Sequence, residues 1–214
     1  MAAATLASLK IQNPSESNLA VTVLDRELRV ILLTAANRHS GVTSSSLSMA
    51  SELARSSRGR VLLVDTSLSE QSLTRQLGLD QQQGFLDLAL AEQPPLLASC
   101  IQAGEPQGFD FLPLGRRQQY AERLTPELLR ERLHSLAGDY RFVILDGDPV
   151  YSSGDILTLA TQVDGVVLVV RSEETRWEVA QAAAQRLIQA EAKLIGSVFN
   201  ARKYYMPKWV YDRL

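Results

Sequence analysis

The 214 residues, 45% of them hydrophobic and 21% charged, are enough for one α/β domain with a sizeable core. The net charge of −2 excludes the basic footprint of a nucleic-acid-binding protein, and a single cysteine, Cys100, excludes an intramolecular disulfide and is typical of a reducing compartment. No apolar run approaches the ~20 residues of a membrane span, and the N-terminus lacks a signal-peptide pattern, so we expect a cytoplasmic protein.

The first part of the chain predicts an arm followed by a domain. Residues 1–18 are small and polar and indicate a flexible N-terminal arm, while residues 19–200 carry the periodic apolar pattern of the domain. Leu19–Leu24 is compatible with a strand or a short helix. Residues 201–214 form a basic and aromatic C-terminal tail.

The stretch from Val30 to Leu53 predicts a strand, a loop and a helix. The strand is Val30–Thr34, the loop Ala35–Gly41 lacks bulky apolar residues, and a helix follows to Ser56. In this arrangement loop N–H groups and the positive end of a helix dipole converge on an anion. The frame G-x-x-x-x-G-K-[ST] of a phosphate-binding loop places Gly41, Thr43 and then Ser44 correctly, but Val42 stands where the frame has lysine.

The missing lysine predicts weak phosphate binding. A hydrogen bond to a charged group contributes roughly 1.5–3 kcal/mol, so its loss alone weakens binding by about tenfold to a hundredfold. The lysines of the chain lie near its two ends, at Lys10, Lys193, Lys203 and Lys208, and Arg38 sits at the outer lip of the loop. The hydroxyl groups of residues 43–46 have two equally good interpretations. One of them is the ordinary N-cap of the helix, or else the hydroxyl of Thr43 is a magnesium ligand.

The remaining elements alternate between strands and helices. This alternation predicts a doubly wound, mainly parallel sheet with helices on both faces. The expected central strands after the first are Val61–Asp65, Phe142–Asp146, Val166–Val170 and Ile195–Phe199, with a further strand near Phe109–Gly115. Helices are expected over 69–77, 84–95, 125–138, 152–162 and 175–191.

Two of these strands end in carboxylates. Asp65 and Asp146, with Arg171 after a third strand, should meet the loop at the carboxyl edge of the sheet, where ligands of such folds bind. A simpler interpretation is that the two aspartates only solvate loops or cap helices. His39 and His134 are interpreted as surface residues and Cys100 as packing.

At this point the order of motifs resembles a known family. VLLVD, GFLDLAL, FDFLPLG, TPELL, FVILDGDPV, DGVVLVVRSEETR and LIGSVFN follow the loop as they do in the cytoplasmic domain of bacterial tyrosine autokinases, within the MinD/ParA-like branch of P-loop proteins. These kinases accompany capsule and exopolysaccharide export. The resemblance implies a P-loop NTPase-like fold and Mg-ATP as the cofactor of a working site, with Thr43, Asp65 and Asp146 as the residues that would hold Mg²⁺. It also implies a membrane-embedded polysaccharide co-polymerase, or chain-length determinant, as partner.

The family's functional motifs are only partly present. Its D-x-D strand end keeps Asp65 but has Ser67 for the second carboxylate, and its I-I-D-T-P-P strand end keeps Asp146 but has Gly147 and Asp148 next. His39 stands where the family has a glycine. Nucleotide-binding residues carried over by the resemblance are Gly41, Val42, Thr43, Ser44 and Arg171, which we interpret as vestigial.

The resemblance also implies a tyrosine-rich tail that neighbouring subunits phosphorylate. The candidate phosphoacceptors here are Tyr204, Tyr205 and Tyr211; a merely solvated tail is the alternative. The family's arginine-rich activating helix has no clear counterpart before the loop, which leaves a homo-oligomer in doubt.

Two function classes follow from the sequence. The first is a pseudokinase, a scaffold or regulator of polysaccharide assembly that is peripheral at the inner membrane through its partner and needs no cofactor. The second is a divergent active tyrosine kinase or ATPase, or a MinD-like positioning ATPase.

Overall fold

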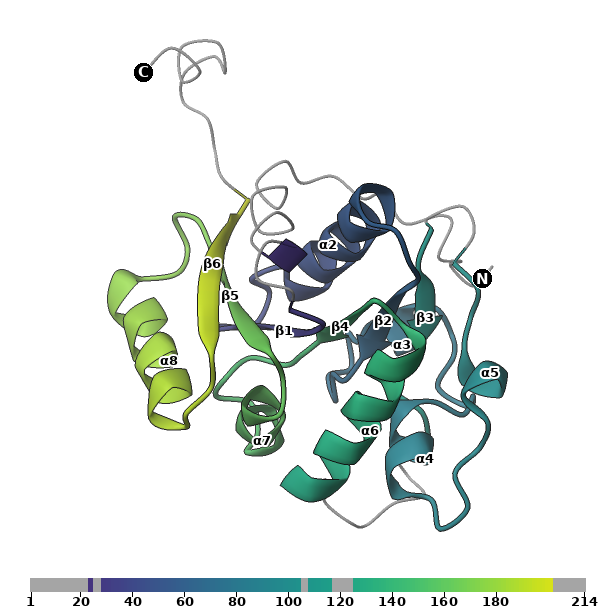
Figure 1. Cartoon of the computed structure of the whole chain (residues 1–214). Helices are drawn as coiled ribbons and strands as arrows, with labels where there is room; N and C mark the ends of the chain where they lie inside the picture. The colour runs from purple at the N-terminus through teal and green to yellow at the C-terminus, as the bar shows by residue number, and fades with distance from the viewer. Residues whose placement is uncertain (1–22, 25–27, 105–107, 117–124, 202–214) are drawn as a thin grey trace.

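Six parallel strands form the centre of the protein. The computed structural model describes residues 23–24, 28–104, 108–116 and 125–201. Within this part the sheet order is β3-β2-β4-β1-β5-β6, and all neighbouring strands run parallel (Figure 1). The strands are β1 Val30–Ala35, β2 Val61–Asp65, β3 Asp110–Leu112, β4 Phe142–Asp146, β5 Gly165–Arg171 and β6 Leu194–Asn200. The predicted strands and their parallel arrangement are confirmed.

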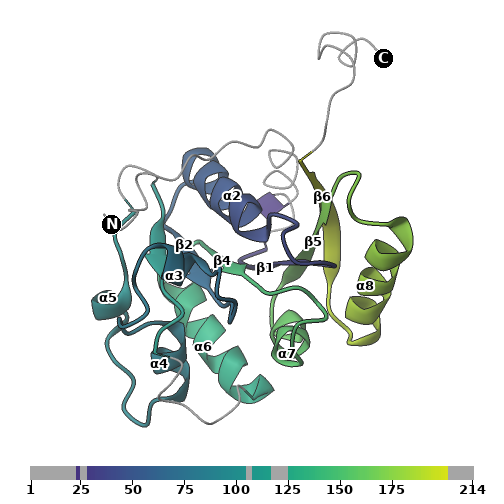
Figure 2. The same ribbon diagram turned by 180° about the vertical axis from the view of Figure 1, so that it is seen from behind.

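Helices cover both faces of this sheet, as a doubly wound fold requires (Figures 1 and 2). The helix α2 (Val42–Ser56) packs on one face with α3 (Leu73–Gln76), while α4 (Phe85–Leu90), α6 (Pro126–Asp139), α7 (Asp155–Thr161) and α8 (Trp177–Gln189) pack on the other; α5 is Leu97–Cys100. The apolar strands alternate between these two layers, so each face of the sheet contributes to its own core.

Differences from the expected elements concern their ends and the short helix α5, which was not predicted. The segment 69–77 is helical only over α3, because Asp65 accepts two hydrogen bonds from Thr74 and fixes the preceding loop. The helix α6 begins as predicted, with Thr125 as N-cap and Pro126 in the first turn, but it continues through Gly138 and ends at Asp139, with Tyr140 as its C-cap. Cys100 is buried, and His39 and His134 are on the surface, as predicted.

Other predictions lie outside the described residues. They concern the arm 1–18, most of Leu19–Leu24, and the tail with Tyr204, Tyr205 and Tyr211. Among the helices that the structure describes, none has the length and apolar character needed to cross a bilayer.

Candidate functional site

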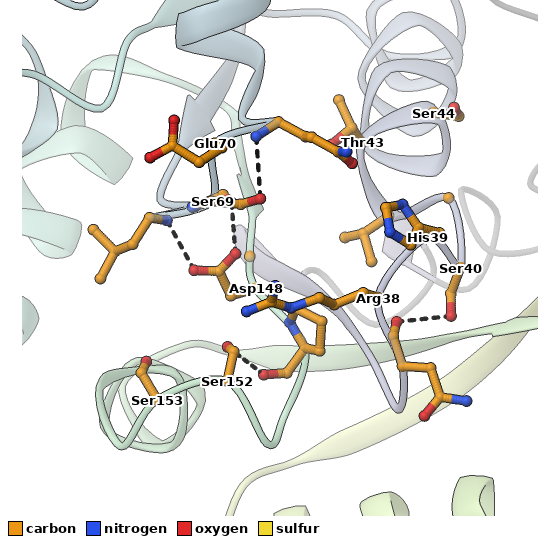
Figure 3. A pocket seen from close by; sticks show the side chains of 18 of the residues that line it. Arg38, His39, Ser40, Thr43, Ser44, Ser69, Glu70, Asp148, Ser152 and Ser153 are labelled. Atoms are coloured by element: carbon orange, nitrogen blue, oxygen red, sulfur yellow. Dashed lines mark hydrogen bonds between the residues drawn. The ribbon is translucent and has the colours of Figure 1, made fainter.

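A cavity of about 520 Å³ opens at the carboxyl edge of the sheet, within the size range of small-molecule sites (Figure 3). Three loops form it: the loop between β1 and α2, the loop after β2, and the loop after β4. Its lining residues are Asn37–Ser44, Ser67–Gln71, Gln76, Gly147–Pro149, Ser152 and Ser153. The predicted loop and two of the predicted strand ends therefore do converge.

The loop before α2 has the backbone shape of an anion-binding loop. Gly41 is the N-cap of α2 and has a left-handed φ of 88°, and His39 also has a positive φ, of 61°. This conformation favours glycine, because a side chain at positive φ clashes with the following carbonyl. The loop is built as though a glycine stood at position 39, although the residue there is histidine.

Two side chains from the neighbouring strand ends hold this loop. Arg171 Nη1 donates to the carbonyl of His39 at 2.9 Å, and Asn200 Nδ2 donates to the carbonyl of Ser40 at 2.9 Å. Asn200 also fills the space beside Gly41, since a Cβ at Gly41 would lie 1.7 Å from Asn200 Nδ2. Arg171 was predicted to bind nucleotide; it is not among the residues that line the cavity, and it also pairs with Glu174 at 2.9 Å. The sequence did not identify Asn200 as a residue that holds this loop.

The first turn of α2 presents hydroxyls and one apolar side chain to the site. Val42 and Thr43 are half-buried in the cavity wall and Ser44 is exposed. The N-cap interpretation of the hydroxyls is wrong, because the N-cap is Gly41 and no side chain caps the helix. Ser46 instead donates to Asp146 Oδ1 at 3.0 Å, one turn below the cavity.

Asp65 is fully buried and its two oxygens are already bonded. Oδ1 accepts from the Ser67 N–H at 3.0 Å, and Oδ2 accepts from the N–H and the hydroxyl of Thr74 at 2.7 and 2.6 Å. Burial raises the pKa of Asp65, and the bonds from Thr74 and Ser67 oppose that shift. These contacts make Asp65 an anchor for the loop between β2 and α3.

Asp146 lies beside Asp65, at the paired position of the neighbouring strand. It is also buried, and its Oδ2 has no hydrogen-bond partner among the described residues. Burial first, and then the negative charge of Asp65, raise the pKa of Asp146 to about 7, against the opposing effect of hydrogen bonds from Thr43 and Ser46. A carboxyl group in this position holds a proton over part of the neutral range.

Asp148 has a partner that the sequence did not reveal. Its carboxylate accepts from the Ser67 hydroxyl at 2.6 Å and from the Leu68 N–H at 2.8 Å (Figure 3). Ser67 stands where the D-x-D motif predicts a second carboxylate, and its hydrogen bond holds the carboxylate of Asp148 beside it. A negative charge from the loop after β4 therefore lies at the cavity wall.

The charges that line the cavity do not favour a polyanion. Arg38 is the one lysine or arginine among the lining residues, against the carboxylates of Glu70 and Asp148. Arg38 projects over the cavity and makes no hydrogen bond or ion pair with any described residue (Figure 3).

Mg-ATP, the group that the fold implies, fits these residues poorly. Of the expected metal ligands Thr43, Asp65 and Asp146, Asp65 has no free oxygen, and within the described part of the chain no cluster of three or more histidine, cysteine or acidic side chains could hold a metal ion. Val42 offers no charge to a phosphate, and Asp148 repels one.

Comparison with known proteins identifies relatives of this chain. No protein-family model matches it. It is 26% identical over 188 residues to the tyrosine-protein kinase YwqD of Bacillus subtilis, covering 87% of this chain and 78% of YwqD. It is 25% identical over 203 residues to the tyrosine-protein kinase Etk of Escherichia coli, covering 90% of this chain but only 28% of Etk.

Solved structures agree on the fold. The VpsO kinase domain superposes with a TM-score of 0.74 at 28% identity, covering 88% of this chain and 94% of that domain. The MinD cell division protein of Aquifex aeolicus superposes with a TM-score of 0.67 at 19% identity, covering 85% and 73% of the two chains, and shares the fold alone. The chain is thus similar in sequence to bacterial tyrosine kinases and has the P-loop NTPase-like fold of their kinase domains.

Proposed function

We propose that this protein is a tyrosine-kinase-like domain that does not turn over ATP and acts as a scaffold or regulator in exopolysaccharide or capsule assembly. The observation that carries the proposal is Val42, which occupies the lysine position of a loop whose backbone shape is retained. The charge balance of the cavity supports it, because one arginine faces two carboxylates.

The partner in this proposal is a membrane-embedded polysaccharide co-polymerase. The support is the similarity to bacterial tyrosine kinases, and the chain would be held at the inner membrane through that partner. Phosphorylation of Tyr204, Tyr205 or Tyr211 by another kinase of this class is part of the same proposal.

Arg38 favours a second candidate function, that of a divergent active kinase or ATPase. Its guanidinium projects over the cavity with no described partner and could meet a phosphate in place of the lysine. Under this reading, nucleotide binding depends on Arg38.

Restoring the loop chemistry tests the first proposal. The double variant Val42→Lys with His39→Gly should bind ATP·Mg measurably, because lysine supplies the missing charge and glycine relaxes a strained position. The matched control is Val42→Met with His39→Gly, which keeps the side-chain length without the charge and should bind no better than wild type. Wild-type binding that Arg38→Ala abolishes would favour the second candidate instead.

The scaffold role has its own test. The wild-type protein should bind the cytoplasmic segments of the co-polymerase equally well with and without ATP·Mg. Binding that requires ATP·Mg would contradict a nucleotide-independent scaffold.

A further inference from the structure

Large apolar side chains are exposed along one side of α8. Trp177 is 71% exposed and Ile188 is 59% exposed. They are eleven residues apart, about three helical turns, so both lie on the same side of the helix. Ala183 and Leu187 are buried against the sheet, so the Trp177 side is a flank of α8 and not its core-facing side.

The edge strand β6 adds a third exposed apolar side chain, at the end of the sheet where α8 begins. Phe199 is 54% exposed, and β6 is the last strand of the sheet. Val198 packs in the core cluster under α2, so its neighbour Phe199 points to the opposite, α8-covered face. The helix α8 begins at the carboxyl edge of the sheet, where β6 ends (Figures 1 and 2). Trp177 is the first residue of α8 and Phe199 the last but one of β6, so both belong to this edge. We call Trp177, Ile188 and Phe199 the α8 corner.

The chain itself passes this corner before residues 202–214 follow. Asn200 ends β6 two positions before the tail starts, and Ala201 turns with a positive φ of 54°. Thirteen residues span at most about 45 Å when extended, whereas the thirteen residues of α8 measure about 20 Å. The tail is therefore long enough to run along all of α8.

The composition of the tail complements the corner. It contains apolar and aromatic residues throughout, among them Tyr205, Trp209 and Val210, and four basic side chains against one acidic side chain. Around the start of α8 the three carboxylates of Glu173, Glu174 and Glu178 outnumber the two guanidinium groups of Arg171 and Arg176, and Arg171 already pairs with Glu174 at 2.9 Å. Apolar burial would supply affinity and the opposite charges orientation.

We propose that residues 202–214 dock on the α8 corner of their own chain and cover Trp177. The direct covalent connection at Asn200 gives the tail a high effective concentration at this surface, which favours its own chain over a second copy. The inference is independent of whether the cavity binds nucleotide.

Tryptophan fluorescence can test this docking directly, because the chain has two tryptophans, Trp177 and Trp209. In full-length Trp209→Phe protein, Trp177 is the sole reporter and should be shielded from acrylamide. Adding Tyr205→Ser, Val210→Ser and Tyr211→Ser should release the tail and raise the quenching constant by about twofold or more, since the covering apolar contacts are lost. Leu96→Ser, which removes an apolar side chain that is 80% exposed on another element, is the control and should change nothing.

Three results would overturn the inference. Quenching of Trp177 that equals that of free tryptophan in Trp209→Phe protein would show an uncovered corner. Quenching that the three tail substitutions leave unchanged would show that something other than the tail covers it. Shielding that grows with protein concentration, with a dimer in sedimentation velocity, would assign the corner to a second copy.

Discussion

At the scale of single residues, His39 shows that the backbone conformation of the loop and the side chains on it point to different functions. Its backbone has the positive φ of a phosphate-binding loop. A residue with a Cβ atom, such as histidine, is strained in this conformation. Val42 and Asp148 change the charge of the same cavity without changing its backbone. The loop thus has the backbone geometry of an anion-binding loop without a lysine at position 42.

Replacing His39 should therefore stabilise the protein. We expect His39→Gly to raise the free energy of unfolding by about 0.5–1 kcal/mol, because relief of the left-handed strain exceeds the entropy that glycine adds to the unfolded chain. Urea unfolding measures the change. Gly41→Ala is the opposing control and should destabilise, since the new Cβ would collide with Asn200. A lower urea midpoint for His39→Gly would contradict the strain argument.

Asp146 should make stability depend on pH. The folded protein keeps a proton on this carboxyl up to about pH 7, whereas the unfolded chain loses it near 3.8, so the stabilising contribution is complete below about pH 4 and is lost as pH rises through 7. Asp146→Asn, which mimics the protonated group, should be more stable than wild type at pH 8 by roughly 1–3 kcal/mol and nearly equal at pH 4.

Thermal unfolding across this pH range measures the effect of Asp146→Asn. The control Glu52→Gln removes a surface carboxylate that bonds only to Arg55 and Ser56 of its own helix, and it should leave the pH profile unchanged. A constant difference between Asp146→Asn and wild type from pH 4 to 8 would show that Asp146 does not titrate in this range.

At the scale of elements, the ends of β5 and β6 and the loop before α2 form one unit. Arg171 and Asn200 donate to consecutive carbonyls, those of His39 and Ser40. The loop is thereby held from outside the cavity, while its hydroxyls and Arg38 line the inside. Its conformation depends on the last strand of the sheet.

Removing one of these two bonds should loosen the loop. We expect Asn200→Ala to speed amide hydrogen exchange in residues 37–44 by about tenfold, because one hydrogen bond contributes about 1 kcal/mol to holding them closed. Ser152→Ala, which removes an exposed hydroxyl bonded only within its own turn, is the control. Faster exchange confined to residues 194–200, with 37–44 unchanged, would argue that Asn200 supports β6 alone.

The elements show what the sequence could predict and what it could not. The strands were predictable because continuous apolar runs such as Val61–Val64 end in a carboxylate, and the start of α6 was predictable from Thr125 and Pro126. The contacts that define the cavity join residues far apart in the chain, such as Ser67 with Asp148 and Ser40 with Asn200. No pattern in the local sequence indicates contacts between residues so far apart. The hydrogen bonds that Asp65 and Asp148 accept could therefore be found only in the three-dimensional structure.

At the scale of the whole molecule, the doubly wound sheet brings three loops to one edge, where they form the cavity. The fold is that of kinase domains and MinD, while the cavity has one arginine against two carboxylates. The fold alone suggests a nucleotide-dependent enzyme, whereas the charges of the cavity do not favour a nucleotide. The proposed scaffold role rests on the cavity and not on the fold.

Titration of the purified wild-type protein with ATP·Mg by isothermal calorimetry tests that central claim most directly. We predict no saturable heat up to about 1 mM ATP, corresponding to a binding free energy weaker than about −4 kcal/mol, with the Val42→Lys and His39→Gly variant as the binding control. A micromolar Kd for ATP or ADP in the wild-type protein would contradict the proposed loss of nucleotide binding.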